Sequence, residues 1–154
     1  MPLLEFDFPF WYEERQETDL ADQRRSIRGK TVRLLARPGL LPNPLNWLKD
    51  RAINDGEEEV REAAVRELAR GWRTDPETLT FLKDRARNDE HWNVRQAAVE
   101  ELTRGWRTDA DTLPFLKDRA RNDEHGDVRR AAVQELARGW RTDPETLAFL
   151  EVKE

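Results

Sequence analysis

The feature that most constrains this chain is a segment of 34 residues that occurs twice in succession. Residues 71–104 and 105–138 are identical at 26 of 34 positions, and both begin with Gly-Trp-Arg-Thr-Asp. The same five residues recur from Gly139, one period later. A period of this length is the signature of a repeat protein, in which each unit buries its apolar face only by stacking on its neighbours. We therefore expect a quasi-linear array of similar units.

The periodicity reaches beyond the two best copies and sets the predicted organisation. Residues 45–55 match residues 79–89 at most positions, and Val60 then aligns with Val94. The length of 154 residues suits one domain. Within a single domain of residues 1–154 we predict a diverged N-terminal cap repeat at 1–40, repeats at 41–70, 71–104 and 105–138, and a C-terminal capping helix at 139–154.

Each unit is expected to form two short helices, the first of which begins at Thr74 or Asp75. Asp75 can cap a helix that has Pro76 at its first position, or Thr74 can form a capping box with Glu77. The apolar residues that follow recur at helical spacing and predict one buried stripe, made of Leu79, Leu82 and Ala86.

The second helix is expected to start near Asn93 and to end at Gly105. Gly105 is predicted to cap the helix in the left-handed conformation, with Trp106 folding back on the last turn. Helices this short are marginal alone, so both must pack against neighbours. The apolar face of the second helix consists of Val94, Ala97, Ala98 and Leu102.

Composition excludes several classes of protein. The 27 basic and 32 acidic residues give a net charge of -5, which argues against a protein held on nucleic acid by bulk electrostatics. The absence of cysteine excludes disulfides and thiolate metal sites. No apolar stretch of about 18 residues and no secretory leader is present, so we expect no membrane association, and the cytoplasm is the default location.

The second helix of each unit, as in residues 122–133, resembles HEAT repeats of the short variety, and the resemblance covers residues 41–150. It implies an all-α fold, a right-handed α-solenoid of two-helix repeats whose second helices line the concave face. In HEAT arrays, an Asp in the inter-helix turn and an Arg six residues later form a ladder that links successive repeats. The matching pairs are Asp55 with Arg61, Asp89 with Arg95, and Asp123 with Arg129.

A narrower resemblance connects the combination Gly-Trp-Arg-Thr-Asp-Pro-Glu-Thr-Leu, Leu-Lys-Asp-Arg-Ala and Asn-Asp-Glu-His to the HEAT-like arrays of cyanobacterial NACHT-type NTPases. The chain itself has no Gly-rich phosphate loop with Lys and Ser or Thr. Short HEAT-like repeats also build the phycobilin lyases, although only the repeat supports that alternative. A shared fold does not decide function.

The sequence offers little material for catalysis. His91 and His125 lie one period apart in equivalent turns, so they do not converge on a shared metal ion. No cysteine nucleophile, Ser-His-acid set or pair of converging carboxylates stands out. We therefore expect no catalytic residue, no metal and no cofactor, and we predict that the protein is not an enzyme.

The positions at which the near-identical repeats differ point to a binding surface. Gln96, Glu100 and Thr103 are three of the eight differing positions, and their i, i+4, i+7 spacing forms one ridge of the second helix. Either such exposed positions simply drift, or they recognise a protein or peptide. Our hypothesis is a mixed-charge recognition ridge made of Glu62, Arg66, Gln96, Glu100, Arg130 and Gln134.

Trp92 is the odd residue of the turns, because Gly126 takes its place one repeat later. Tryptophan is enriched at binding hot spots, so Trp92 is a candidate anchor for a partner. The alternative is that its indole packs on the neighbouring turn.

A nucleic-acid-binding module would need a stripe of arginines along the second helices. Arg66 and Arg130 would belong to such a stripe, but Gln96 and Glu100 interrupt it.

The two ends differ from the middle. An aromatic cluster near the N-terminus forms either cap packing or a docking segment, and it consists of Phe6, Phe8, Phe10, Trp11 and Tyr12. The C-terminal helix ends the array without a second helix, so its apolar residues offer a contact to another subunit: Leu147, Phe149, Leu150 and Val152. The leading interpretation is a non-enzymatic scaffold or adaptor for a protein or peptide, with a homo-oligomer formed through the terminal helices. A nucleic-acid-binding HEAT-like module and a phycobilin-lyase-like protein are the alternatives.

Overall fold

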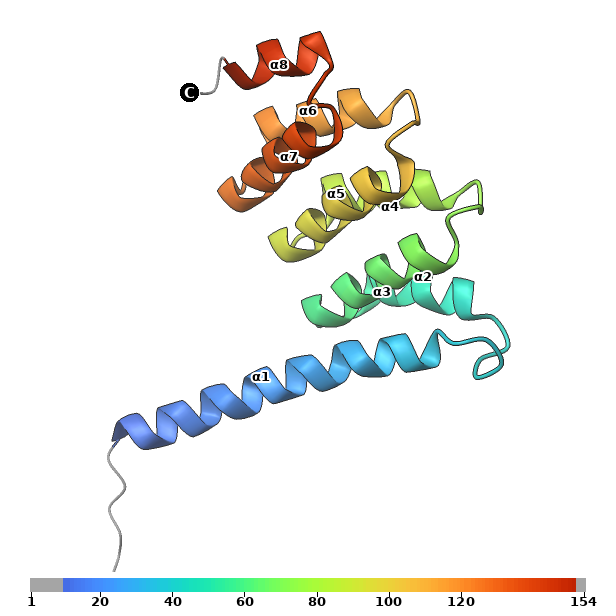
Figure 1. Cartoon of the computed structure of the whole chain (residues 1–154). Helices are drawn as coiled ribbons and strands as arrows, with labels where there is room; N and C mark the ends of the chain where they lie inside the picture. The colour runs from blue at the N-terminus through green and yellow to red at the C-terminus, as the bar shows by residue number, and fades with distance from the viewer. Residues whose placement is uncertain (1–9, 152–154) are drawn as a thin grey trace, which may run out of the picture.

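The chain forms a stack of helices (Figure 1). The computed structural model describes residues 10–151, with side chains from residue 20 onward. Within those residues the elements are all α-helices and there is no strand. The helices are α1 (Phe10–Leu35), α2 (Pro44–Asn54), α3 (Glu58–Gly71), α4 (Thr78–Asn88), α5 (Trp92–Trp106), α6 (Thr112–Asn122), α7 (Gly126–Gly139) and α8 (Pro144–Glu151).

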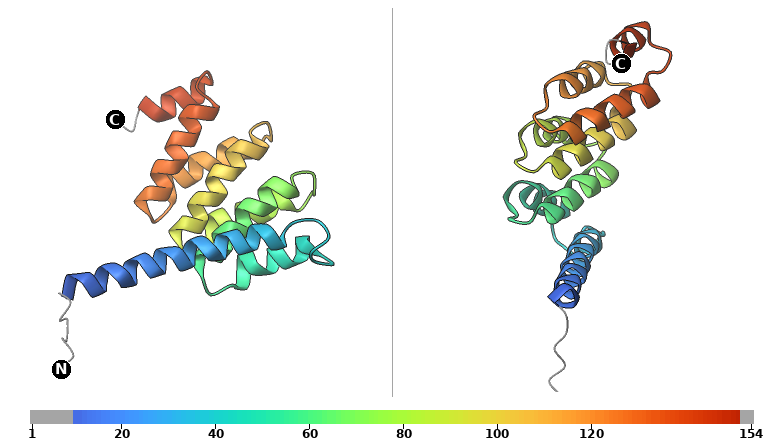
Figure 2. Two further views of the ribbon diagram at one scale, coloured as in Figure 1. Left: turned by 60° about the horizontal axis from the view of Figure 1, so that its bottom comes forward. Right: turned by 90° about the vertical axis from the view of Figure 1, so that its left-hand side faces the viewer.

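Three helical hairpins make up the middle of the stack, as the 34-residue period predicts. Each first helix packs on the second helix that follows it, which gives the pairs α2 with α3, α4 with α5, and α6 with α7. The second helices α3, α5 and α7 also contact one another in sequence, and α1 packs on α3 (Figures 1 and 2). The expected all-α solenoid of helical repeats is confirmed.

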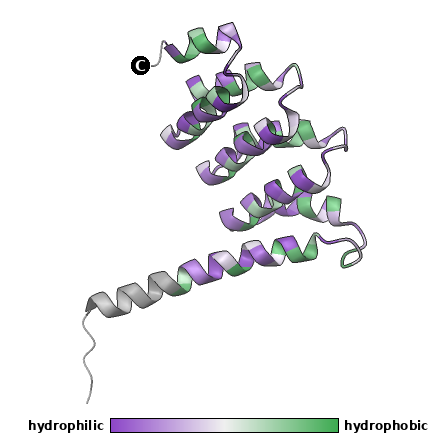
Figure 3. Cartoon of the chain, in the orientation of Figure 1, coloured by the Kyte–Doolittle hydropathy of each residue, from purple (hydrophilic) through white to green (hydrophobic). Residues whose placement is uncertain are grey.

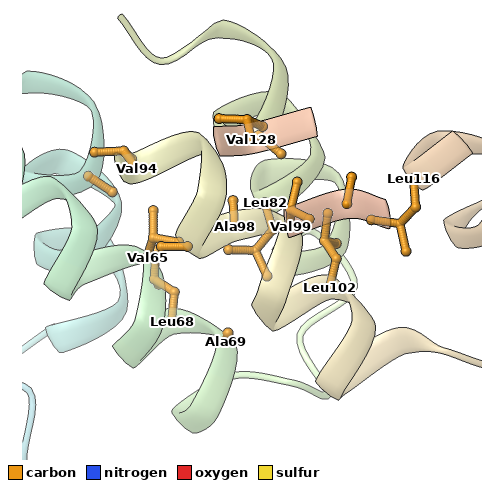
Figure 4. Close-up of a cluster of buried hydrophobic side chains, with 14 of the residues drawn as sticks. Val65, Leu68, Ala69, Leu82, Val94, Ala98, Val99, Leu102, Leu116 and Val128 are labelled. Atoms are coloured by element: carbon orange, nitrogen blue, oxygen red, sulfur yellow. The ribbon is translucent and has the colours of Figure 1, made fainter. Parts of the chain in front are cut away.

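The core lies between the two helix layers of the stack (Figure 4). Leu82 of α4 and Leu102 of α5 meet there, and both are fully buried. Ala98 is also fully buried, and its small side chain lets the helices approach one another closely. Apolar residues are concentrated where the helices face one another, and polar residues cover much of the rest (Figure 3). The predicted apolar faces of both helices are therefore the ones that pack.

The first helix of each full repeat begins later than the capping residues suggested. We expected a start at Thr74 or Asp75, but α4 begins at Thr78. The Asp75 carboxylate accepts hydrogen bonds from the backbone N–H of Glu77 at 3.0 Å and from the Thr78 hydroxyl at 3.3 Å. These bonds hold residues 75–77 in a turn ahead of the helix. The Asp caps directly only at α8, where Asp143 accepts from the Thr146 N–H at 2.7 Å.

The predicted left-handed glycine cap at Gly105 is wrong. Helix α5 continues through Gly105 to Trp106, and among the described residues only Gly39 has a positive φ. A different constraint acts at this position: a Cβ on Gly105 would lie 3.4 Å from the Arg73 side chain. The glycine therefore leaves room for an arginine of the preceding repeat.

The two ends are single helices in the part of the chain that the structure describes. Helix α1 is much longer than the second helices and projects beyond the stack (Figures 1 and 2). It lies within residues 1–40, the segment that we predicted to be a diverged cap repeat. Within the aromatic cluster, Phe6 and Phe8 lie outside the described residues, as do the side chains of Phe10, Trp11 and Tyr12. At the other end, α8 packs on α7.

Candidate partner-binding surface

The ridge residues occupy matching places on three successive helices. Glu62 and Arg66 lie on α3, Gln96 and Glu100 on α5, and Arg130 and Gln134 on α7. Because the helices repeat every 34 residues and lie side by side, the three pairs form one continuous strip across the layer of second helices. The strip carries two cations, two carboxylates and two amides, so its charge is mixed.

Arg66 is the centre of an internal network and is not a free recognition group. Its guanidinium contacts the carboxylates of Glu62 at 3.1 Å, Glu100 at 3.0 Å and Glu101 at 3.4 Å. Gln96 donates a further hydrogen bond to Glu100 at 2.9 Å. Burial alone would lower the pKa of Arg66, but Glu100 and Glu62 outweigh it and hold the pKa above its ordinary value. This half of the ridge therefore joins α3 to α5.

The other half of the ridge is open to solvent. The Arg130 side chain is 70% exposed, against 21% for Arg66, and its ion-pair partner is Asp127 of the same helix at 2.8 Å. Gln134 is exposed one turn further along α7. Thr103, which the i+7 spacing placed on the same ridge, is instead buried and donates its hydroxyl hydrogen bond to the Val99 carbonyl. The ridge side chains that remain exposed are therefore on α7.

A groove of about 310 Å³ lies beside this open half, between the C-terminal parts of α5 and α7. Three of its lining side chains are arginines and two are glutamates. The Arg138 side chain is mostly exposed, whereas Glu135 beneath it is buried. The lining residues that bear on recognition are Glu100, Arg104, Arg107, Glu135 and Arg138.

Trp92 packs between turns of successive repeats. Its indole stacks on the His125 ring with centroids 4.7 Å apart and planes 3° from parallel, and on His91 at 6.0 Å. Each histidine also caps a helix: the Nδ1 atoms of His91 and His125 accept hydrogen bonds from the N–H groups of Asn93 and Asp127, both at 3.3 Å. Trp92 is only partly exposed, and its contacts make it a link between repeats.

The ladder arginines bind carboxylates of the following repeat. Arg61 donates to Asp89 from Nε at 3.1 Å and from Nη2 at 3.2 Å. Its Nη1 donates to the backbone carbonyl of Asp55, six residues earlier, at 2.8 Å. The Asp and Arg residues of the predicted ladder are therefore the ones in contact, but the pairing differs from the prediction. The Asp six residues before each Arg contributes its backbone carbonyl oxygen, and the carboxylate comes from the Asp of the next repeat.

The same geometry recurs once and then stops. Arg95 binds Asp123 in the same bidentate way, and its Nη1 reaches the Asp89 carbonyl at 2.8 Å. Arg129 donates to the carbonyls of Asp123 at 2.7 Å and Glu124 at 3.0 Å. The carboxylate of Asp55, at the start of the ladder, is bound by Arg51 at 3.1 Å.

Two buried glutamates at equivalent positions were not predicted from the sequence. Glu101 is only 2% exposed and accepts hydrogen bonds from Arg104 at 2.6 Å and from Arg66 at 3.4 Å. Glu135, its counterpart one repeat later, accepts from Arg138 at 2.9 Å. Burial raises the pKa of Glu135, and nearby Glu100 adds to that effect while Arg138 opposes it. The signal was available, since each repeat has a Glu beside its apolar stripe and an Arg three residues later.

One acidic cluster has the ligand types that a metal ion could use. The carboxylates of Glu57, Glu58 and Glu59 approach one another at the start of α3. Two of the three are bound by arginines of α1: Arg28 contacts Glu57 at 2.5 Å, and Arg25 contacts Glu59 at 2.7 Å.

None of the helices in the described residues combines the length and the apolar composition that a membrane span requires.

Helical hairpins stacked in register through a repeated Arg–Asp contact define an α-solenoid repeat protein. A family model described as HEAT repeats matches residues 19–103, 45–137 and 83–151. The chain belongs to this family, and HEAT repeats generally serve as protein-interaction scaffolds. No curated protein and no solved structure matches the chain. The family match does not extend to the narrower resemblance to arrays of NACHT-type NTPases.

Proposed function

We propose that the chain is a non-enzymatic scaffold that binds a protein or peptide on the layer formed by α3, α5 and α7. The observation that carries the proposal is the exposure of Arg130 and Gln134 on α7, on the same helix face as Arg138, which lines the groove between α5 and α7. These two positions differ from their counterparts in the preceding repeat, although most of that repeat is copied unchanged. They are also exposed, so their side chains can form new contacts, in which a partner carboxylate would compete with Asp127 for Arg130.

The partner that fits this surface is a segment of mixed charge with acidic side chains. Arg130 and Arg138 are each 70% exposed and present guanidinium groups that can bind carboxylates bidentately. Glu100 and Glu135 at the same groove disfavour a polyanion, and Arg66 is already shared among three carboxylates. These contacts favour a protein partner over a nucleic acid.

The test uses the full chain as an immobilised bait with a charge-reversed variant beside it. Arg130→Glu should reduce capture of the main bound protein by about tenfold, the effect of losing roughly 1.4 kcal/mol of binding free energy. Arg141→Glu makes the same change of charge on the exposed turn after α7 and should leave capture unchanged. Equal capture by wild type and Arg130→Glu, or equal loss with both variants, would remove this surface from consideration.

The resemblance to arrays of NACHT-type NTPases supports a more specific role. In that role the scaffold is a sensing or regulatory array whose occupancy controls an NTPase. Quantitative identification of the captured proteins tests this part separately. Recovery of a P-loop NTPase that depends on Arg130 supports the regulatory role. Recovery only of proteins without a nucleotide-binding site leaves a scaffold and removes the regulatory role.

A further inference from the structure

The N-terminal helix exposes a leucine that every full repeat buries. Leu34 stands 34 residues before Leu68, in the place that Leu102 and Leu136 occupy in later repeats. Those three leucines are 0% exposed, whereas Leu34 is 49% exposed. Contacts support the register, because Arg33 approaches Glu67 at 3.6 Å and a Cβ on Gly29 would lie 4.0 Å from Ala63. Both contacts join residues one period apart, so α1 stands where a second helix of a repeat would.

The exposure of Leu34 has a simple cause. In each full repeat the first helix covers this leucine, as Leu82 of α4 covers Leu102 of α5 (Figure 4). Within the described residues, no first helix takes the corresponding place beside α1, whose main contact is with α3. Helix α1 is therefore the second half of a repeat whose first half is not supplied by the described part of the chain.

The C-terminal helix α8 lacks the other half of a repeat, a second helix. Helix α8 aligns with the first helices α2, α4 and α6, and Leu150 aligns with Leu48, Leu82 and Leu116. Those three leucines are fully buried, but Leu150 is only partly buried, and Leu147 is 44% exposed. No described second helix follows α8, and apolar residues make up much of this helix (Figure 3). Helix α8 is therefore the first half of a repeat.

The charges of the two half repeats are also complementary. Helix α8 carries Glu145 and Glu151 and no basic residue. Residues 23–35 of α1 contain five basic residues and no acidic one. Lys30 is exposed at the place where the full repeats have a buried alanine against the first helix, and no ion pair joins it to the described side chains. Arg25, Arg28 and Arg33 already pair with glutamates of α3, and Glu145 pairs with Lys117. Among the described side chains, Lys30 on α1 and Glu151 on α8 remain as opposite charges available to a contact between these two helices.

We propose that α8 of one copy of this chain docks on α1 of a second copy and completes a repeat across the junction. Leu150 and Leu147 then cover Leu34 as Leu82 covers Leu102 within the chain. The interface is heterologous, because the two copies contribute different surfaces, and it leaves one free end of each kind. Copies associate head to tail, and the assembly grows with concentration.

Sedimentation velocity of the full chain, from micromolar to several hundred micromolar, tests the proposal. The wild type should show a mass that rises with concentration, whereas Leu34→Asp and Leu147→Asp should each remain monomeric. Ile53→Asp, an equally exposed apolar position on α2, is the matched control and should associate as the wild type does. Thermal melts of each variant verify folding, and Lys30→Glu provides a second variant of α1 that should also weaken association.

An equimolar mixture of the two blocked variants gives the decisive result. Leu34→Asp retains a competent α8, and Leu147→Asp retains a competent α1, so the mixture should form a heterodimer and nothing larger. A wild type that stays monomeric over the whole range would overturn the proposal. So would self-association of Leu147→Asp at wild-type strength, because that result would mean that α1 pairs with something other than α8.

Discussion

Arg95 of α5 donates two hydrogen bonds to the carboxylate of Asp123 in the next repeat, from Nε at 3.1 Å and from Nη2 at 3.0 Å. Both side chains are buried. The third nitrogen, Nη1, donates to the Asp89 carbonyl in the turn before α5. One guanidinium thus fixes the turn of its own repeat and the position of the following hairpin, which makes the ladder a device for keeping the repeats in register.

Removal of the ladder carboxylate should destabilise the array strongly. Asp123→Ala removes both bidentate hydrogen bonds and leaves the buried Arg95 guanidinium with only the exposed Glu124 carboxylate at 3.1 Å, so we expect a loss of about 3 kcal/mol, the low end of the range for a broken buried pair. Urea unfolding followed by circular dichroism measures the loss. The double variant Arg95→Met with Asp123→Leu should recover most of the stability, because apolar replacement of both partners avoids the unpaired charge.

The matched control for the ladder is Asp118→Ala. Asp118 pairs with Arg119 at 2.7 Å and lies nearer the solvent, so we expect a loss of less than about 1 kcal/mol. Similar losses in Asp118→Ala and Asp123→Ala would contradict the structural role assigned to the ladder.

Leu102→Ala should lower the free energy of unfolding by about 2–5 kcal/mol, because it leaves a cavity between α4 and α5. Differential scanning calorimetry should show a lower or broader transition. Leu40→Ala removes the same atoms from an exposed position and should change the melt little. An unchanged melt of Leu102→Ala would be incompatible with the packing of the hairpin.

The two arginines of the ridge should respond differently to charge reversal. Arg66→Glu places a further carboxylate among Glu62, Glu100 and Glu101, and we expect it to reduce stability by roughly 1–3 kcal/mol. Arg130→Glu lies at an exposed site and should cost less than about 1 kcal/mol. Chemical denaturation of both variants checks the difference. If both are equally stable, Arg66 is not the centre of the network described above.

Glu135 should give the array a characteristic dependence on pH. Because burial raises the pKa of Glu135, the folded state holds the proton more tightly than the unfolded chain does. The stability from this group is therefore complete below the ordinary carboxyl pKa of about 4.3 and is lost as pH rises through the folded-state pKa. Glu135→Gln removes that loss, so its stability relative to the wild type should increase as the pH rises above about 4.3.

Urea titrations at several pH values measure this difference. Glu145→Gln makes the same substitution at a mostly exposed side chain on α8 and is the control. A difference from the wild type that does not change with pH for Glu135→Gln would remove the buried carboxyl as the cause.

The fold could be predicted from the sequence to the level of individual hairpins, because near-identical 34-residue repeats adopt the same structure. The apolar stripe containing Leu82 and the start of α5 near Asn93 were accessible for that reason. The start of α4 was not, since Asp75 can either cap a helix or close a turn, and only the packed position of Thr78 decides between them. Gly105 illustrates the same limit, because its close neighbour is an arginine of another repeat.

The candidate surface was predictable as a set of positions and not as a set of free groups. The i, i+4 spacing placed Gln96 and Glu100 on one face of a helix, as the structure shows. The spacing of residues within one helix does not show which side chains of an adjacent helix lie nearby. The ion pair between Arg66 of α3 and Glu100 of α5 therefore could not be predicted. Trp92 differs from Glu100, because packing of its indole on the neighbouring turn was one of the two predicted alternatives, and its stacking partner His125 lies in that turn.

The bidentate ladder contacts span 28 residues, and they join each hairpin only to the next one. Excision of residues 71–104 would therefore set Arg61 opposite Asp123, with the same chemistry at the new seam. Recombination between near-identical copies can shorten or lengthen such a gene by whole units, and each product keeps its ladder pairs matched. The ladder therefore leaves the number of repeats free to vary.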